Sequence, residues 1–258
     1  MTQLVFITGA SSGIGQALAL RFYRAGFSLA LVARRSEVMQ DWILAQGIEP
    51  ARVRLYNADV ANVASIVAAG QKCMLSQGLP DVVIANAGIS VGMDTAVRSD
   101  LEVMARIFAT NNIGLAATFH PFIDAFCSRG SGTLVGIGSV AGIRGIPGHG
   151  AYCASKSAVI AYCESLRGEL RSSGVAVVTI CPGYVDTPLT LENRYSMPFL
   201  MQTDDFAQRA FKAIIAGSSY LVIPWQMGGV AKLLRMLPNW LFDKAFSGRP
   251  RKRRADAT

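Results

Sequence analysis

The 258-residue chain has little histidine, and its cysteines show no ordered spacing. Two histidines, His120 and His149, are too few for a histidine-based metal site, so we expect no metal. The cysteines are odd in number, form no C-x-x-C pair and lie mostly in apolar stretches: Cys73, Cys127, Cys153, Cys163 and Cys181. We therefore expect buried free thiols in a reducing, cytoplasmic compartment rather than a disulfide framework.

Long apolar runs and linkers are also missing. No uninterrupted apolar stretch is long enough to span a bilayer. The chain passes from Met1 directly into a strand-like segment, so we expect no cleavable signal peptide. With no Pro/Gly/Ser-rich linker and no internal repeat, we predict one catalytic domain over residues 1–228 and an extension over residues 229–258.

The net charge of +8 is concentrated near the end of the chain. The last ten residues carry one acid, Asp256, and five bases, which together give +4: Arg249, Arg251, Lys252, Arg253 and Arg254. The rest of the chain is only mildly basic, so the sequence does not indicate a nucleic-acid-binding face.

Segments that suit strands alternate with segments that suit helices. We expect strands at residues 4–9, 27–34, 51–59, 82–88, 132–139, 175–183 and 220–224. The clearest helices are expected at residues 14–25, 100–129 and 151–172. Near-continuous apolar strands separated by helices predict an α/β fold, a Rossmann-type doubly wound parallel sheet of about seven strands with helices on both faces. Ligands then bind at the carboxyl ends of the strands.

A glycine turn joins the first expected strand to the first helix. The segment TGASSGIG lets the backbone turn tightly and approach a pyrophosphate, which the helix N-terminus attracts with its unpaired N–H groups. The candidate cofactor-binding residues here are Gly9, Ser11, Ser12, Gly13, Ile14 and Gly15. A glycine-rich turn alone is weak evidence, but its place between strand and helix predicts a dinucleotide site.

Ser139, Tyr152 and Lys156 supply a chemical interpretation. Tyr152 and Lys156 are four residues apart, so they share one face of a helix, thirteen residues after Ser139. Tyrosine, with a usual pKa of about 10, is a usable acid at neutral pH, and a neighbouring lysine favours its phenolate. Tyr-x-x-x-Lys occurs by chance in many helices; with the serine and the glycine turn it favours carbonyl reduction.

These motifs, in this order over residues 4–222, resemble the short-chain dehydrogenase/reductase superfamily, in its compact single-domain branch. The resemblance implies that Tyr152 is the general acid in reduction and the base in oxidation, that Lys156 lowers its pKa and holds the nicotinamide ribose, and that Ser139 orients the substrate oxygen. Asn111 takes the family's proton-relay position, with adjacent Asn112 as the competing choice. Further cofactor contacts are implied at Asp59, Asn86, Gly88, Tyr152, Lys156, Pro182, Val185 and Thr187.

The end of the second expected strand bears on the choice of cofactor. An NAD-preferring site usually has an acidic residue near Ala33, and here Arg34 follows instead. A guanidinium suits a 2′-phosphate, so we expect NADP(H) to be preferred, with Arg34 as the main contact and Ser11 assisting. The alternative is that Arg34 and Arg35 are only solvated surface charges. In that case NAD(H) remains a possible cofactor.

The segment after Thr187 corresponds to the family's mobile substrate lid, and it is apolar: Leu189, Leu191, Tyr195, Met197, Pro198, Phe199, Leu200 and Met201. This favours a hydrophobic or acyl-chain substrate part over a bare sugar, although the residues could instead close the core. His149 lies close to Tyr152 in sequence; a contact with the substrate is one interpretation, but we expect it to be a solvated loop residue.

Residues 229–247 are rich in leucine, aromatic and basic residues, and Pro238 is expected to separate two short helices. This pattern fits an amphipathic extension at an anionic membrane surface, with the basic tail drawn to lipid headgroups. Packing on a partner subunit and a solvated tail are the alternatives. We therefore expect a protein that is cytoplasmic or peripheral at the inner face of a membrane.

The combined motifs predict an NADP(H)-dependent oxidoreductase that interconverts a ketone or aldehyde and an alcohol by hydride transfer. The family resemblance also implies a homodimer or homotetramer through the helices near 100–129 and 151–172. The alternative from another class is a non-catalytic NADP(H)-binding regulatory or scaffold protein, which would not require Ser139, Tyr152 and Lys156 together. Epimerisation of a nucleotide-sugar is disfavoured by the chain length and the glycine spacing.

Overall fold

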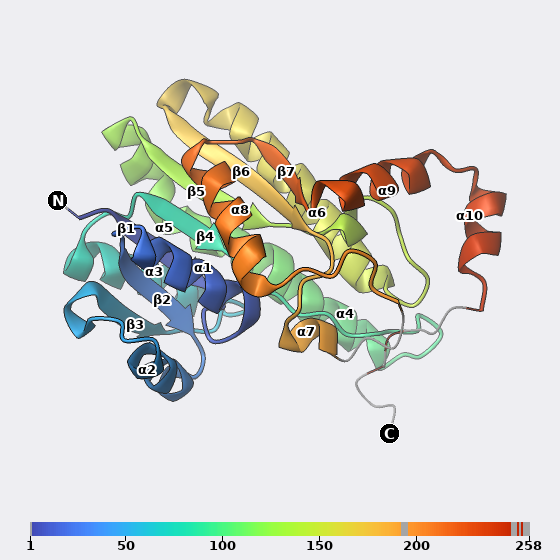
Figure 1. Cartoon of the computed structure of the whole chain (residues 1–258), viewed down its shortest axis with the longest axis horizontal. Helices are drawn as coiled ribbons and strands as arrows, with labels where there is room; N and C mark the ends of the chain where they lie inside the picture. Colours follow the sequence, from blue (N-terminus) through green and yellow to red (C-terminus); the bar gives the residue numbers. More distant parts are fainter. Residues whose placement is uncertain (1, 192–195, 249–251, 253, 255–258) are drawn as a thin grey trace.

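A parallel sheet between two layers of helices forms the body of the protein (Figure 1). The computed structural model describes residues 2–191, 196–248, 252 and 254. Within these residues, seven parallel strands pair in the order β3-β2-β1-β4-β5-β6-β7. They are β1 Leu4–Thr8, β2 Ser28–Ala33, β3 Val53–Asn57, β4 Val82–Ala85, β5 Gly132–Ile137, β6 Val175–Pro182 and β7 Tyr220–Ile223. Each strand lies inside a segment that the sequence predicts.

Strand β1 shows why these segments are apolar almost throughout. Val5 and Ile7 pack into the hydrophobic cluster on one face of the sheet, while Leu4 and Phe6 pack into the cluster on the other. Successive side chains of a strand point to opposite faces, so a strand covered on both sides needs two interleaved apolar sets. The predicted doubly wound parallel sheet is confirmed.

Three main helices cover each face. On one side lie α1 (Gly13–Arg24), α2 (Ser36–Ala45) and α8 (Thr203–Ile215), and on the other lie α3 (Val63–Gln77), α5 (Gly114–Arg129) and α6 (Gly150–Glu169). Phenylalanine fills both layers: Phe22 and Phe206 on the first face, Phe119, Phe122 and Phe126 on the second. Truncating a buried phenylalanine of this kind to alanine typically costs about 3–5 kcal/mol.

The helix expected over residues 100–129 contains an irregular turn. Helix α4 (Asp100–Phe108) continues into a π-helical turn at Ala109–Ile113, and α5 follows without a break in direction. Such single turns widen the helix by one residue and are frequent at functional sites. Here the π-helical turn contains Asn111, which it places in the interior of the protein.

The C-terminal segment forms two helices, α9 (Trp225–Met236) and α10 (Asn239–Phe246), and Pro238 separates them as predicted. Arg144, in the loop after β5, holds this segment. Its guanidinium donates to the carbonyl oxygens of Leu234 and, at 2.8 Å, Leu237, and its Cζ lies 3.9 Å from the centroid of the Phe242 ring. None of the helices in residues 2–191 and 196–248 is long and apolar enough to cross a membrane.

Candidate functional site

The predicted site residues gather at the carboxyl edge of the sheet. The strand order reverses between β1 and β4, and open α/β sheets bind ligands outside the carboxyl ends of the strands at such a point. The glycine turn follows β1, and the other predicted residues follow the remaining strands along the same edge: Arg34 after β2, Asp59 after β3, Asn86 and Gly88 after β4, Ser139 after β5, and Val185 and Thr187 after Pro182, the last residue of β6.

The glycine turn is held in place by backbone and amide contacts. Gly9 has a φ of +66°, a conformation that favours glycine, and a Cβ on Gly15 would collide with the Gly9 carbonyl oxygen. Asn86 Nδ2 donates to the carbonyl oxygens of Thr8 at 3.0 Å and Gly9 at 3.2 Å. Helix α1 begins after Ser12 and has no acidic residue in its first turn. The arrangement suits an anionic group at the helix N-terminus.

The loop after β6 closes over this turn. A Cβ on Gly13 would lie 3.1 Å from Cβ of Thr187, so the two segments are in close contact. Val185 is buried, and its carbonyl oxygen accepts a hydrogen bond from Thr190 Oγ1 at 2.6 Å. The Arg34 side chain is exposed at the far end of the same edge. Backbone donors at one point and a cation at another fit the phosphates of a dinucleotide.

Ser139 and Tyr152 meet at the end of β5. Tyr152 is in the first turn of α6, and a hydrogen-bonding contribution from the Ser139 side chain acts on the pKa of its hydroxyl. Ser139 Oγ also accepts a hydrogen bond from the backbone N–H of Ala141 at 3.1 Å, which fixes its position. Burial raises the pKa of Tyr152 to about 12, and the hydrogen bond with Ser139 opposes this with a smaller lowering effect.

Lys156 lies one turn further along α6 and is only 5% exposed. Its Nζ donates to the carbonyl oxygen of Ile137 at 2.7 Å and lies 5.9 Å from the centroid of the Tyr152 ring. Burial lowers the pKa of Lys156 to about 8. The resemblance implies a Tyr152 pKa lowered by Lys156, whereas in this structure burial outweighs the lowering effects and leaves the pKa of Tyr152 above its usual value.

Asn111 lies beside Lys156. A Cβ on Gly88 would lie 3.3 Å from Asn111 Oδ1 and 3.5 Å from Lys156 Nζ, so both polar groups approach this glycine. Asn111 Oδ1 accepts from the backbone N–H of Ile89 at 2.9 Å, and Nδ2 donates to Ser155 Oγ at 2.9 Å. The neighbouring Asn112 instead donates to the Ser155 carbonyl oxygen at 2.8 Å. The structure therefore places Asn111, of the two candidates, at Lys156.

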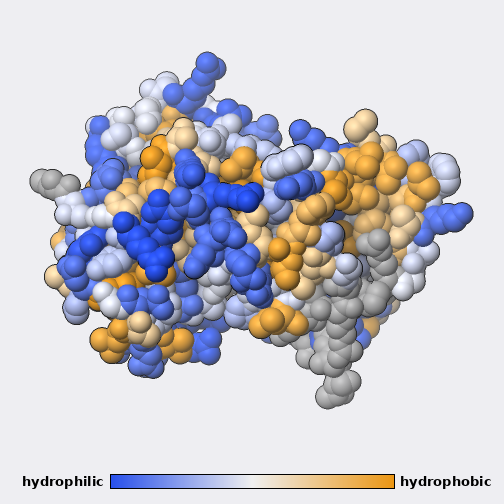
Figure 2. All heavy atoms as spheres, in the orientation of Figure 1, coloured by the Kyte–Doolittle hydropathy of each residue, from blue (hydrophilic) through white to orange (hydrophobic). Residues whose placement is uncertain are grey.

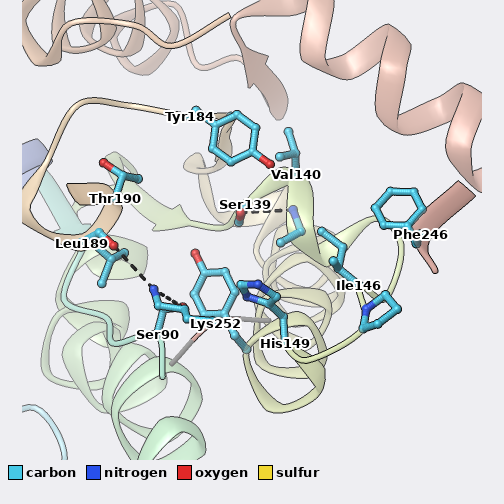
Figure 3. A pocket seen from close by; sticks show the side chains of 14 residues that line it. Ser90, Ser139, Val140, Ile146, His149, Tyr184, Leu189, Thr190, Phe246 and Lys252 are labelled. Carbon is cyan, nitrogen blue, oxygen red and sulfur yellow. Dashed lines mark hydrogen bonds between the residues drawn. The ribbon is translucent and has the colours of Figure 1, made fainter. Parts of the chain in front are cut away.

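A cavity of about 130 Å³ opens beside Ser139 and Tyr152 (Figure 3). The sequence did not predict four of its polar lining residues, Ser90, Tyr184, Thr190 and Lys252, and it disfavoured a fifth, His149. The expectation that His149 is solvated is wrong, because it caps the start of α6 and is only 7% exposed. Burial, together with the positive charge of Lys252, lowers the pKa of His149 below its usual value.

Part of the basic tail returns to the body of the protein. Lys252 is 9% exposed, and Arg254 forms an ion pair with the buried Asp100, with Nε 2.7 Å from Oδ2. These two residues therefore contact the body of the protein, a placement that the sequence analysis did not predict. The other tail arginines and one lid residue lie outside the described part of the chain: Arg249, Arg251, Arg253 and Tyr195. The tail's composition, typical of a solvated terminus, contained no signal for this placement.

The five cysteines are unbridged, and all except Cys127 are buried, as predicted. Burial raises the pKa of Cys163 to about 12, so this thiol is protonated at neutral pH. Three of them, Cys153, Cys163 and Cys181, pack on α6 and β6, while Cys73 lies in α3 and Cys127 in α5.

Comparison with known proteins agrees with the fold. The family model described as short chain dehydrogenase matches residues 3–197, and the chain belongs to this family of oxidoreductases. An uncharacterized oxidoreductase of Myxococcus xanthus is 39% identical over 93% of this chain and 94% of its own length. A dehydrogenase/reductase SDR family protein 7-like of Anopheles gambiae is 36% identical over 73% of this chain, but the match spans only 61% of that relative.

Among solved structures, a short-chain dehydrogenase from Sphingobium yanoikuyae in complex with NADPH superposes with a TM-score of 0.77. It is 26% identical, and the alignment covers 92% of this chain and 97% of that one.

Proposed function

We propose that the protein reduces a ketone or aldehyde to an alcohol with NADPH, reversibly. The observation that carries the proposal is that Ser139 and Tyr152 line one cavity, with Lys156 one helical turn from Tyr152 and Asn111 beside Lys156 across Gly88. When NADPH is bound, its nicotinamide supplies the hydride. The exposed Arg34 and the NADPH complex of the Sphingobium yanoikuyae relative support this cofactor over NADH.

The hydroxyls of Ser139 and Tyr152 are placed to donate hydrogen bonds to a substrate carbonyl oxygen. Negative charge develops on that oxygen during reduction, so donors fixed in a buried site stabilise the transition state. Tyr152 then passes its proton to the oxygen as the general acid. A pKa of about 12 keeps Tyr152 protonated at neutral pH, which suits the reductive direction.

Lys156 and Asn111 complete the proton path in this proposal. Lys156 lies one helical turn from Tyr152, and its positive charge favours the phenolate that remains after proton transfer. Asn111 lies beside the ammonium across Gly88 and holds the backbone of Ile89 with both of its amide atoms. We assign Asn111 to positioning the groups that return a proton to Tyr152.

The test is NADPH and NADH oxidation against a panel of aldehydes and ketones. Tyr152→Phe removes the acid but keeps the ring, so we expect turnover to fall by about 10²–10⁴-fold. Tyr162→Phe, on the same helix and partly exposed, is the matched control and should keep its activity. Turnover that survives in Tyr152→Phe would contradict the acid assignment. NADPH binding without turnover of any carbonyl would contradict the reductase and favour a binding protein.

Two surfaces support the proposed assembly and location. Exposed apolar residues on α4, the π-helical turn and α6, namely Leu101, Ile113 and Tyr162, favour a homodimer or homotetramer through these helices. A second set, which we name the C-terminal apolar face, consists of exposed residues on α9 and α10: Trp225, Leu233, Met236 and Trp240. Figure 2 shows hydrophobic residues gathered over α9. With Lys232 and Arg235 on the same helix, this face fits an anionic membrane surface.

A further inference from the structure

Ser155 lies on α6 between Tyr152 and Lys156 and is completely buried. Its hydroxyl donates to the carbonyl oxygen of Tyr152 at 2.8 Å, so the hydroxyl hydrogen is used within the helix. The hydroxyl oxygen also accepts a hydrogen bond from Asn111 Nδ2 at 2.9 Å. Serine in the middle of a helix often makes the first of these bonds. The second bond joins α6 to a residue 44 positions earlier in the chain, in the π-helical turn.

The π-helical turn binds Ser155 at two atoms. Asn111 binds the hydroxyl, and the next residue, Asn112, donates to the Ser155 carbonyl oxygen at 2.8 Å. Two consecutive side chains of the turn therefore hold one residue of α6, through its side chain and through its backbone. Asn112 Oδ1 is buried and has no hydrogen-bond partner among the described residues, which is unfavourable for stability. Such buried groups are rare in folded proteins and call for an explanation, for which a role at a functional site is one choice.

Asn111 uses both ends of its amide group. Nδ2 donates to Ser155 Oγ and, at 3.0 Å, to the Ile89 carbonyl oxygen, while Oδ1 accepts the N–H of Ile89 at 2.9 Å. The two contacts with Ile89 decide which end of the amide is the oxygen, but Ile89 lies in the loop after β4. The bond to Ser155 ties the same amide to α6, the helix that carries Tyr152 and Lys156.

The carbonyl end of Asn111 approaches Lys156. From a Cβ placed on Gly88, Asn111 Oδ1 lies at 3.3 Å and Cγ at 3.9 Å, so the oxygen is the end that points to this glycine. Lys156 Nζ lies 3.5 Å from the same point. A carbonyl oxygen has two lone pairs, and the N–H of Ile89 uses one of those on Asn111 Oδ1. An acceptor near a buried ammonium favours its charged form, so the position of this oxygen bears on the chemistry at Lys156.

We propose that Ser155 is a further positioning residue of the site, which holds the Asn111 carbonyl oxygen toward the Lys156 ammonium. The inference rests on the proposed carbonyl reductase and adds to it a residue that does not line the cavity. Ser155 acts through Asn111, and Asn112 supports it by fixing the backbone of α6 at the same residue. Loss of the Ser155 hydroxyl should therefore slow the proton-transfer step and leave binding of substrate and cofactor unchanged.

The test compares Ser155→Ala with Ser157→Ala in the reduction of benzaldehyde by NADPH. Ser157 is also on α6, is exposed, and donates to the Gly142 carbonyl oxygen at 2.6 Å, so its replacement removes a side-chain hydrogen bond away from Asn111. Ser155→Ala should lower kcat by about 2- to 10-fold, the effect of one hydrogen bond, without changing KM or the Kd for NADPH. Ser157→Ala should keep the wild-type kcat. Ser155→Cys, which keeps the shape but is a weaker acceptor, should fall between wild type and Ser155→Ala.

A double-mutant cycle with Asn111→Ala tests whether Ser155 acts through Asn111. Where the amide is already absent, there is nothing left for Ser155 to position, so adding Ser155→Ala should lower kcat by less than about 2-fold. A general loss of stability would not give this pattern. Equal fold-losses with and without Asn111 would overturn the proposal, as would a wild-type kcat in Ser155→Ala.

Amide hydrogen exchange, followed by NMR, separates this inference from the reductase itself. The N–H of Ile89 donates to Asn111 Oδ1, so its exchange rate reports how firmly the amide is held. We expect exchange at Ile89 to be about 2- to 10-fold faster in Ser155→Ala and unchanged in Ser157→Ala. Faster exchange in a protein that reduces no carbonyl would reject the reductase and keep the positioning role. Unchanged exchange and unchanged kcat, in a protein whose turnover depends on Tyr152, would reject the role of Ser155 alone.

Discussion

The glycine turn and the C-terminal tail reach the same edge of the sheet, but they are built in opposite ways. The turn is built from backbone that directly follows β1, and Asn86 and Gly15 contact it at the Gly9 carbonyl oxygen. The tail relies on side chains from distant positions: Lys252 contacts Ser90, 162 residues earlier, and Arg254 contacts Asp100, 154 residues earlier. The turn is fixed by backbone geometry next to one strand, while the tail is fixed by side-chain contacts that span more than 150 residues of sequence.

Gly15→Ala should give the largest effect, because Gly15 makes the closest backbone contact within the glycine turn. The new Cβ would collide with the Gly9 carbonyl oxygen, so the turn or the start of α1 must move. We expect a loss of about 2–4 kcal/mol in unfolding free energy, from strain and repacking, and a loss of NADPH binding. Urea unfolding and fluorescence titration with NADPH measure the two effects.

Gly168→Ala is the matched control, since it is also a helical glycine but has open space around its Cβ position. It should stabilise the protein by about 0.5–1 kcal/mol, because alanine is the better helix former. Equal behaviour of the two variants would mean that the turn is not packed as described.

Lys156→Met tests the buried ammonium of the candidate site. The pKa of Lys156 is about 8 in the folded protein, against 10.5 for an ordinary lysine, so between these values the unfolded chain binds more protons. Wild-type stability should therefore gain a rising contribution as pH increases through this window. At neutral pH, Lys156 is protonated in both the folded and the unfolded protein, and the folded protein retains the cost of burying this charge. We therefore expect the unfolding free energy of Lys156→Met to exceed that of wild type by about 3 kcal/mol.

The measurement is urea unfolding of both proteins from pH 7 to pH 10. The difference between them isolates Lys156, since the buried tyrosines and cysteines titrate in both. The difference in unfolding free energy between Lys156→Met and wild type should become smaller as pH rises. Carbonyl reduction by Lys156→Met should be lost at every pH. A constant gap would show that Lys156 is not charged inside the folded protein at pH 7.

Arg34→Ala should have a smaller and more selective effect. The proposed contact with the 2′-phosphate is a charge-assisted pair, so its loss should raise the Kd for NADPH by about 10- to 100-fold and leave the Kd for NADH unchanged. Arg35→Ala is the control, because it removes a neighbouring exposed charge. A similar loss in both variants would indicate general charge attraction rather than a specific phosphate contact.

The smallest effect is expected at the C-terminal apolar face. Trp240→Gln removes one exposed aromatic ring, and it should weaken pelleting with anionic liposomes several-fold while carbonyl reduction stays intact. Leu75→Gln, an exposed apolar residue on α3, is the control. Pelleting that does not depend on Trp240 or on anionic lipid would contradict the membrane interpretation. It would favour a second protein subunit as the partner of the C-terminal apolar face.

The sequence predicted the sheet and the glycine turn because their signals are local. Apolar strands such as β1 occupy consecutive residues, and Tyr152 and Lys156 are related by one turn of a helix. The placement of His149, Lys252 and Arg254 could not be predicted in this way. The contacts of Lys252 and Arg254 join residues far apart in the sequence: Ser90 lies in the loop before α4, and Asp100 is the first residue of α4, whose own pattern shows only an acidic first turn.

The pKa of Tyr152 illustrates a different limit. The spacing of Tyr152 and Lys156 predicts their common face, but the balance between desolvation and charge depends on how tightly α6 packs against β5 and β6. That packing leaves Lys156 closest to the Ile137 carbonyl oxygen, and burial decides the direction of both pKa shifts.

The return of the tail also decides where the protein should be modified for laboratory use. Arg254 is four residues from Thr258, so a purification tag or fluorescent fusion placed there would join the chain close in sequence to the Asp100–Arg254 pair. Strand β1 begins at Leu4, at the opposite edge of the sheet from the site. A tag before Met1 leaves the Asp100–Arg254 pair undisturbed, and comparing the two fusions would show how strongly kinetics depend on the last residues of the chain.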